Sequence, residues 1–255
     1  MRRHLIAGAL LIACLVLSLA GSNSAFAAWI YDANSEFKTF EAGASGNNVA
    51  PSFSNFTAGY SQNLGGFTAF AASQHTDNWL SRPGAELQGW SFVNTYSVPA
   101  VVVNTSDSSL NVFNQVDPSQ ILMHPGGTSG NPFNPPISNA VLRFTATNAG
   151  IYSITGDWEA LDVGSATKYV LQNGLTLVSS SSATSTFSFS NISLAQFDTI
   201  DFVVKSDSIG SDTTGLRATI IGVASVPEPA TLTLFGLGGI GLAGIAKRRR
   251  ARKVA

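Results

Sequence analysis

Residues 150–158 read Gly-Ile-Tyr-Ser-Ile-Thr-Gly-Asp-Trp, and apolar and polar side chains alternate along this stretch. Alternation with a period of two is typical of a β-strand that is buried on one face only. Similar short runs, rich in β-branched and aromatic residues, cover 140–146, 167–171, 175–178, 186–190, 199–204 and 216–221. Several short strands at this spacing predict an all-β sandwich or barrel, because helices do not alternate with the strands.

Turn-forming residues separate these runs. Asn173-Gly174 and Asn148-Ala149-Gly150 predict hairpin-type turns, since Asn-Gly accepts positive φ at both central positions. The half before residue 135 is looser, and its expected strands are 67–70, 89–93 and 100–103. A Pro- and Gly-rich loop at 125–132 is a possible domain boundary, but the first half alone is too poor in strands for a stable unit. We therefore expect one sandwich over residues 28–225, with no long amphipathic helix.

Charge is unevenly distributed along the 255 residues, of which only 11% are charged, against the ~25% that is usual in soluble domains. Two of the 14 Lys and Arg residues open the chain, and six lie within its last nine residues. The body keeps six basic and fourteen acidic residues, which gives it a net charge of −8. Without a basic cluster, such a body is not expected to bind nucleic acid.

The first 27 residues have the features of a secretory signal peptide. Arg2 and Arg3 form the positive start, an apolar run follows over 5–19, and Ala25 and Ala27 form an A-x-A cleavage site. The Sec export machinery and signal peptidase are the partners that such a segment implies.

The only cysteine, Cys14, ends a lipobox-like Leu-Ile-Ala-Cys sequence, which leaves a lipoprotein as an alternative. An uncleaved N-terminal anchor is a second alternative. If the signal peptide is removed after Ala27, the mature body contains no cysteine. Disulfides, thiol nucleophiles and thiolate metal sites are then excluded.

The end of the chain predicts a second targeting element, over residues 226–255. The motif Val226-Pro227-Glu228-Pro229-Ala230 precedes sixteen uncharged residues, 231–246, and then the basic tail 247–255, which opens with Lys247-Arg248-Arg249-Arg250. The uncharged segment predicts a marginal transmembrane helix, because a full span takes about 20 residues. By the positive-inside rule the basic cluster stops transfer and stays cytoplasmic. Since Arg2 and Arg3 hold the other end on the same side, the body is expected to face the periplasm.

Residues 226 to about 253 resemble the PEP-CTERM sorting signal of Gram-negative bacteria that make extracellular polysaccharide. The same tail is also known as an ice-binding-protein C-terminal domain, a label that describes the tail and not the body. The resemblance implies processing by an exosortase, a membrane-embedded cysteine transpeptidase that cuts near the motif. It implies a route from the inner membrane to the cell surface or extracellular matrix. An ordinary single-span anchor with a chance Pro-Glu-Pro is the alternative.

From Ile121 onward, the body resembles a β-sandwich module of secreted bacterial proteins. The matching pieces include 122–126, 141–145, 149–156, 171–174, 198–204 and 212–216. Their order resembles that of jelly-roll carbohydrate-binding modules. The resemblance implies a jelly-roll-like sandwich.

Asp157 and Glu159 are the strongest candidate carboxylates. On one strand they would share a face about 7 Å apart, which lies within the separation that glycosidases use. A solvated strand end is the simpler interpretation of the pair.

Weaker candidates for binding lie in predicted loops. Asp207 and Asp212 are candidate calcium ligands, although no cofactor is required. Trp79, among polar neighbours, is the candidate aromatic platform for a sugar. The body has only two histidines, His75 and His124, which is too few for a three-histidine zinc site.

The sequence thus predicts an exported, non-enzymatic surface or matrix protein whose sandwich binds extracellular polysaccharide. A secreted glycan-active hydrolase using Asp157 and Glu159 is one alternative. An ice-binding protein is another, suggested by the Ser- and Thr-rich residues 179–190, although these lack a long T-x-T ladder.

Overall fold

The computed structural model describes residues 28–44, 49–76, 86–92, 98–111, 115–126, 138–162, 166–206 and 212–224. Ala28–Ser225 forms a compact unit by itself. The predicted signal peptide, sorting motif, transmembrane segment and basic tail lie outside the described residues. Within the described ranges, no helix is both long and apolar enough to cross a membrane.

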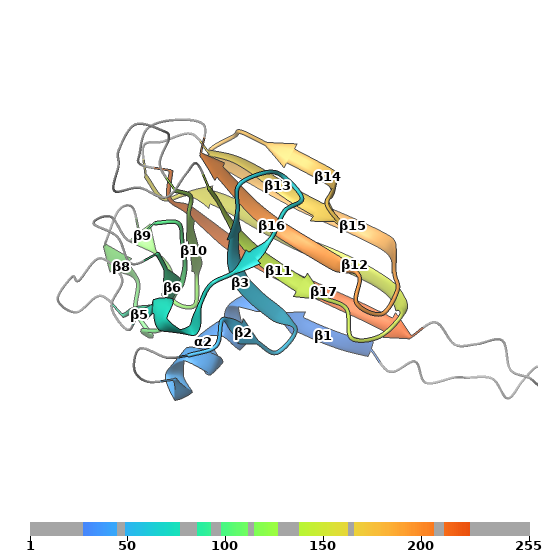
Figure 1. Ribbon diagram of the computed structural model, residues 1–255, viewed down its shortest axis with the longest axis horizontal. Coiled ribbons are helices and arrows are strands. Elements are labelled where there is room, and N and C mark those ends of the chain that lie inside the picture. Colours follow the sequence, from blue (N-terminus) through green and yellow to red (C-terminus); the bar gives the residue numbers. More distant parts are fainter. Residues whose placement is uncertain are drawn as a thin grey trace, which may run out of the picture. The chain divides into compact units, whose positions relative to one another are not determined.

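The body consists of two antiparallel sheets that pack face to face (Figure 1). Sheet A contains β1 (Ala28–Asp32), β5 (His75–Thr76), β6 (Leu87–Ser91), β7 (Ala100–Asn104), β10 (Ile121–His124), β12 (Gly150–Ala160), β15 (Thr184–Leu194) and β17 (Thr214–Ala224). Sheet B contains β2 (Ser52–Phe53), β3 (Phe56–Ser61), β4 (Thr68–Ala69), β11 (Asn139–Thr145), β13 (Ala166–Gln172), β14 (Leu175–Ser180) and β16 (Thr199–Ser206). The remaining elements are α2 (Ala33–Gly43), the 3₁₀ turn η1 (Ala72–Gln74) and the small hairpin of β8 (Leu110–Asn111) and β9 (Gln115–Val116).

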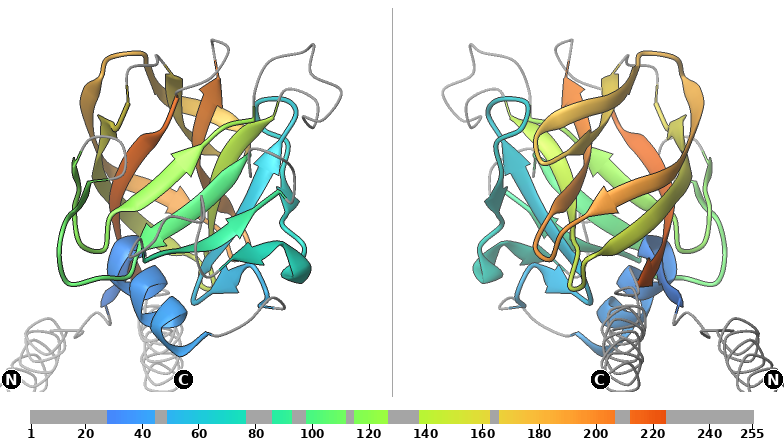
Figure 2. Two further views of the ribbon diagram at one scale, coloured as in Figure 1. Left: turned by 90° about the vertical axis from the view of Figure 1, so that its left-hand side faces the viewer. Right: turned by 90° about the vertical axis from the view of Figure 1, so that its right-hand side faces the viewer.

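The last eight strands have jelly-roll connectivity. Successive strands cross between the sheets, apart from the β13–β14 hairpin, and the orders are β10-β17-β12-β15 in sheet A and β11-β16-β13-β14 in sheet B. This is the arrangement of two Greek keys. The earlier strands extend the same sheets, with β7, β6 and β5 beyond β10 and with β3 and β2 beyond β11. Figure 2 shows the two layers from either end. The prediction of a mostly β sandwich is confirmed.

One of the two predicted hairpin turns is correct. Asn173 and Gly174 have φ values of 49° and 80° and join the neighbouring strands β13 and β14, as predicted. Residues 146–149 instead carry the chain from β11 in sheet B to β12 in sheet A, so they do not form a hairpin. The two strands do not pair because their apolar faces cover one core from opposite sides, which is a property of the tertiary structure.

Helix α2 is an element that the sequence pattern does not predict, although at eleven residues it is not the long amphipathic helix that we expect the body to lack. The Asp32 side chain caps it by accepting from the backbone N–H groups of Asn34 and Ser35. The buried ring of Phe37 stacks on Phe53, with 4.4 Å between ring centroids, and lies 5.5 Å from Trp90. An eleven-residue helix with a single narrow apolar stripe is easily missed beside stronger strand patterns.

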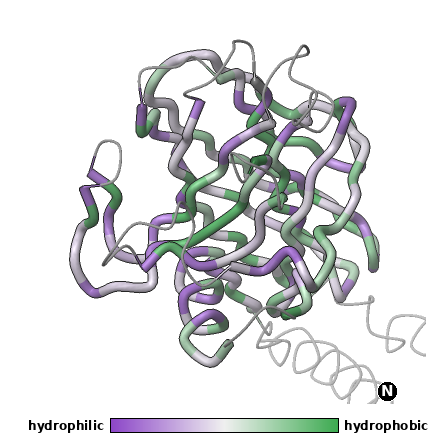
Figure 3. Tube along the Cα trace, turned by 60° about the vertical axis from the view of Figure 1, so that its left-hand side comes forward, coloured by the Kyte–Doolittle hydropathy of each residue, from purple (hydrophilic) through white to green (hydrophobic). Residues whose placement is uncertain are grey.

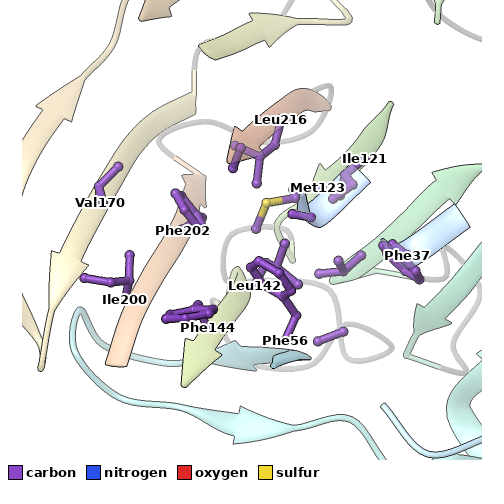
Figure 4. Close-up of a cluster of buried hydrophobic side chains, with 14 of the residues drawn as sticks. Phe37, Phe56, Ile121, Met123, Leu142, Phe144, Val170, Ile200, Phe202 and Leu216 are labelled. Carbon is purple, nitrogen blue, oxygen red and sulfur yellow. The ribbon is translucent and has the colours of Figure 1, made fainter. Parts of the chain in front are cut away.

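The core lies between the two sheets and draws on almost every strand. Figure 4 shows Met123 and Leu216 of sheet A packed toward Leu142, Phe144 and Phe202 of sheet B. Figure 3 shows hydrophobic segments, in green, along strands in the middle of the sandwich. Trp90 and Trp158 are both buried. Trp90 thus belongs to the core.

A smaller apolar cluster covers part of the outer face of sheet A. Leu110 of β8 and Val116 of β9 pack on Val102 of β7 and Leu122 of β10. This cluster fixes the turn at 117–120, between β9 and β10, beside the outer face of β17. The turn places Asp117 and Gln120 against side chains on the outer face of β12 and β17.

Candidate binding site on sheet A

Strands β12 and β17 place a group of charged side chains on the outer face of sheet A. The two strands pair along eleven residues of β12, and Asp157 lies directly opposite Arg217. Trp158 and Leu216 point into the core. Because side chains alternate along a strand, Asp157, Glu159 and Arg217 face outward.

The guanidinium of Arg217 joins three carboxylates. It donates to Asp157 Oδ1 through Nη1 at 3.0 Å and to Asp117 Oδ2 through Nη2 at 2.6 Å. Glu159 Oε2 lies 3.6 Å from Nη1. The Arg217 side chain is 40% exposed, so solvent and ligands reach this centre.

Gln120 ties the turn at 117–120 to the same group. Its Nε2 donates to Glu159 Oε2 at 3.0 Å, and its Oε1 accepts from the backbone N–H of Asp117 at 3.0 Å. Gln120 is itself buried, so its amide holds the Glu159 carboxylate and the backbone of Asp117 in place. We call Asp117, Gln120, Asp157, Glu159 and Arg217 the Arg217 cluster.

The charge state of Arg217 follows from these contacts. Burial acts to lower its pKa, but the hydrogen bond and charge of Asp157, with the charges of Glu159 and Asp117, outweigh it and raise the pKa above its ordinary value. Arg217 therefore stays a cation, and the three carboxylates give the cluster a net negative charge.

A depression of about 280 Å³ lies beside the cluster. Its lining includes Asp32, Asn34, Gln120, Asp157, Arg217 and Thr219. It forms because the edge of β17 is shared by two strands, β10 opposite residues 214–216 and β1 opposite residues 219–223. The space between the two strand ends is open to solvent at the surface.

Asn34 closes the floor of this depression. Its side-chain oxygen accepts from Ala218 N at 3.0 Å, and its Nδ2 donates to the carbonyls of Leu216 at 2.8 Å and Ser119 at 3.0 Å. One amide thus satisfies the β17 backbone where no strand pairs with it. The first turn of α2 positions this amide.

Hydroxyl groups continue the polar surface. Thr155 of β12 lies opposite Thr219 of β17 and opposite Ser188 of β15, which forms a row across three strands. Thr186 of β15 lies opposite Asp157. The outer face therefore offers donors and acceptors around Arg217, without a described aromatic ring lining the depression.

Asp212, the one other predicted candidate that the structure describes, does not line the depression. Asp212 is buried, and its charge acts on Lys168, whose pKa burial lowers, and on His124. Asp207 and Trp79 lie outside the described residues. In the part of the chain that the structure describes, no group of three His, Cys, Asp or Glu side chains could hold a metal ion. His124, the last residue of β10, contacts the carbonyl of Pro125 through Nδ1 at 2.6 Å.

Sequence reasoning missed Arg217, Asp117, Gln120 and Asn34. Arg217 occupies an outward position of a predicted strand, so its exposure was readable, but its partners required the register of β12 against β17. Asp117 and Gln120 come from a turn, and Asn34 from the unpredicted helix. No local pattern connects these segments.

Comparison with known proteins identifies the tail of the chain. Residues 225–250 match the family description "PEP-CTERM protein-sorting motif". The resemblance drawn from the sequence is thus confirmed, and the description names sorting rather than ice binding. The motif implies an exported protein that an exosortase processes and that is sorted to the cell envelope or surface. No curated protein matches the chain.

Several solved structures share weak similarity with the chain. One is the CBM36-1 domain of a multidomain xylanase from the hindgut metagenome of Trinervitermes trinervoides, with 14% identity, 47% of this chain and 97% of that chain covered, and a TM-score of 0.26. Another is a family 35 carbohydrate-binding module from Clostridium thermocellum, with 11% identity, 40% and 91% coverage, and a TM-score of 0.23. A third, CBM36 in complex with calcium and xylotriose, has 16% identity, 38% and 87% coverage, and a TM-score of 0.23. Similarity at this level does not identify what this chain binds.

Proposed function

We propose that the sandwich is a non-catalytic module that binds a neutral extracellular polysaccharide at the Arg217 cluster. The observation that carries this proposal is the half-exposed guanidinium of Arg217, fixed among three carboxylates beside an open depression. The sorting motif supports it, because an exported protein sorted to the cell envelope or surface meets extracellular polysaccharides.

The chemistry of the cluster suits sugar hydroxyl groups. A hydroxyl both donates and accepts, so it pairs with carboxylate oxygens and with guanidinium N–H groups at once. Gln120 and Asp117 already order these groups through hydrogen bonds, so binding loses little side-chain entropy. The Thr219–Thr155–Ser188 row extends the contact surface along a chain-like ligand.

The net charge of the site selects against acidic polysaccharides. Three carboxylates surround one guanidinium, and Asp32 lines the same depression. An anionic sugar would approach like charges, which costs binding energy. A neutral polysaccharide meets no such repulsion.

A binding role fits Asp157 and Glu159 better than hydrolysis does. A glycosidase gives its two carboxyl groups different environments, so that one acts as an acid while the other stays ionised. Here both carboxylates contact the same guanidinium nitrogen, at 3.0 and 3.6 Å. Calcium is not needed for this proposal, and a calcium site at Asp207 and Asp212 stays a prediction.

The test is affinity electrophoresis of the protein in gels that contain xylan, mannan or, as the acidic comparison, alginate. We expect a neutral polysaccharide to retard the unmodified protein. Arg217→Gln should bind at least about tenfold more weakly, which corresponds to a loss of about 1.4 kcal/mol of binding free energy. Lys205→Gln on sheet B removes the same charge elsewhere and should leave the affinity unchanged.

Two outcomes would contradict this proposal. Unchanged retardation of Arg217→Gln would place the binding surface elsewhere. Release of reducing sugar by the unmodified protein, abolished in Asp157→Asn, would instead favour the hydrolase.

A further inference from the structure

Exposed apolar side chains gather at one end of the sandwich. Among the described residues, six large hydrophobic side chains are exposed, and the three most exposed are Leu175 (75%), Phe197 (72%) and Ile30 (67%). Ile151 and Ile221 are also exposed. These five side chains come from different strands and turns, so their common location follows from the fold and not from the sequence order.

The strand registers place all five at the same end. Ile30 lies directly opposite Ile221, and Ile151 lies opposite Val223. Gly150, at the start of β12, pairs with both Leu194 and Ala224. The turns that follow are joined by backbone hydrogen bonds, from Asn173 N to Thr199 O at 3.0 Å and from Phe197 N to Ala146 O at 2.7 Å.

This end, which we call the exit end, is also nearly free of charge. Its turns, residues 54–55, 146–149, 173–174 and 195–198, contain one charged residue, Asp198, and a second carboxylate, that of Glu36 on α2, hydrogen-bonds to Ser54. The carboxylate of Asp198 already accepts from the backbone N–H of Ala195 at 2.8 Å. A protein surface with exposed apolar side chains and so little charge marks a contact site.

Both chain termini of the body leave from the exit end. Ala28, the first residue of β1, pairs with Val223 near the end of β17, and Figure 1 shows β1 (blue) beginning beside the tip of β17 (orange-red). Only residues 225–230 separate β17 from the predicted membrane segment 231–246. Seven residue steps span at most about 25 Å. An inserted tail therefore keeps the exit end close to the bilayer.

We propose that the exit end docks on the surface of the lipid bilayer, with Leu175, Phe197 and Ile30 reaching into the interfacial region. Burial of these side chains in lipid strengthens the membrane attachment that the tail provides, and the small number of charges at the exit end keeps the desolvation cost low. The proposal depends on insertion of the predicted tail helix and not on polysaccharide binding. Arg217 lies six residues along β17 from Val223, or about 20 Å, so docking leaves the Arg217 cluster accessible.

The test uses the full chain, in a Cys14→Ser background, reconstituted into phosphatidylcholine and phosphatidylglycerol vesicles. Leu175→Cys and Phe197→Cys carry an environment-sensitive fluorophore, and the vesicles contain a spin-labelled lipid that quenches it. Thr184→Cys, exposed at the opposite end of β15 from the exit end, is the matched control. Leu237→Cys in the predicted membrane segment reports whether the tail is inserted.

We expect the labels at positions 175, 197 and 237 to lose most of their emission, whereas the label at 184 keeps its emission. Quenching at 237 without quenching at 175 and 197 would overturn the docking proposal while leaving polysaccharide binding untouched. Absence of quenching at 237 would overturn it too, because docking requires the inserted tail. Disulfide cross-linking between copies of Phe197→Cys that survives dilution with lipid would assign the exit end to a second copy.

Discussion

Arg217 and Arg143 both form ion pairs on the sheets, and the two pairs differ in how open they are to solvent. Arg143 on sheet B donates to both oxygens of Asp201, at 2.7 and 2.8 Å, and Asp201 is only 1% exposed. The ring of Phe67 covers the guanidinium, with 4.2 Å between the Cζ atom and the ring centroid. That pair is closed to ligands and serves the fold. Arg217 lies among three carboxylates, and its side chain is 40% exposed against 22% for Arg143, which is why we propose binding at Arg217.

His124 makes the stability of the fold depend on pH. Burial lowers the pKa of His124 below its ordinary 6.5, although its contact with the Pro125 carbonyl and the charges of Asp162 and Asp212 act in the opposite direction. The unfolded chain then binds the proton more readily than the folded one. The stability that neutral His124 contributes is present above about pH 6.5 and is lost as the pH falls toward its folded-state pKa.

We therefore predict that His124→Gln flattens the pH dependence of stability. Urea unfolding at several pH values between about 7 and 5 measures this pH dependence. The free energy of unfolding should fall more steeply with decreasing pH in the unmodified protein than in the variant. Because His75 and the carboxylates are the same in both proteins, parallel curves would contradict the role of His124.

At the scale of elements, α2 is the piece that completes sheet A. β1 and β10 share one edge of β17 and leave a gap, and Asn34 fills that gap with three hydrogen bonds to backbone groups. The helix also covers the core with Phe37. The same geometry opens the depression beside Arg217, so one short helix connects the stability of the sheet with the shape of the site.

Asn34→Ala should lower the free energy of unfolding by about 2–3 kcal/mol, because it leaves buried backbone groups of β17 without partners. Thr39→Ala, at an exposed position of the same helix, should change it by less than about 0.5 kcal/mol. Urea unfolding of the two variants under identical conditions makes the comparison. Equal effects would show that helix propensity, and not the bridge across the gap, is being measured.

At the scale of the whole molecule, the adjacent ends of β1 and β17 matter for export. The first and last strands of the body pair with each other, so Ala28 and Val223 lie at the same end. The location of Arg2, Arg3 and the basic tail in the cytoplasm during transport stays a prediction.

Intact mass and cell fractionation of the protein from its own host test the predicted route. We expect a body that begins near Ala28, ends near the Pro-Glu-Pro motif and lacks the basic tail. A full-length C-terminus in the inner membrane would instead indicate an ordinary single-span anchor facing the periplasm.

Local patterns in the sequence determined the strand content of residues 139–224, the Asn173-Gly174 hairpin and the outward position of Asp157 and Glu159. They did so because alternation and turn chemistry act between residues that are near each other in the chain. The sorting motif was readable for the same reason, since its parts are contiguous.

Only the tertiary structure decided which distant segments meet. It brought the turn at 117–120 and the N-terminal helix to Arg217, and it collected Ile30, Leu175 and Phe197 at the exit end. It also turned the 146–149 connection from a hairpin into a crossing between sheets. These outcomes depend on strand order and register, which are set by burying one common core between the two sheets and not by any local stretch of residues.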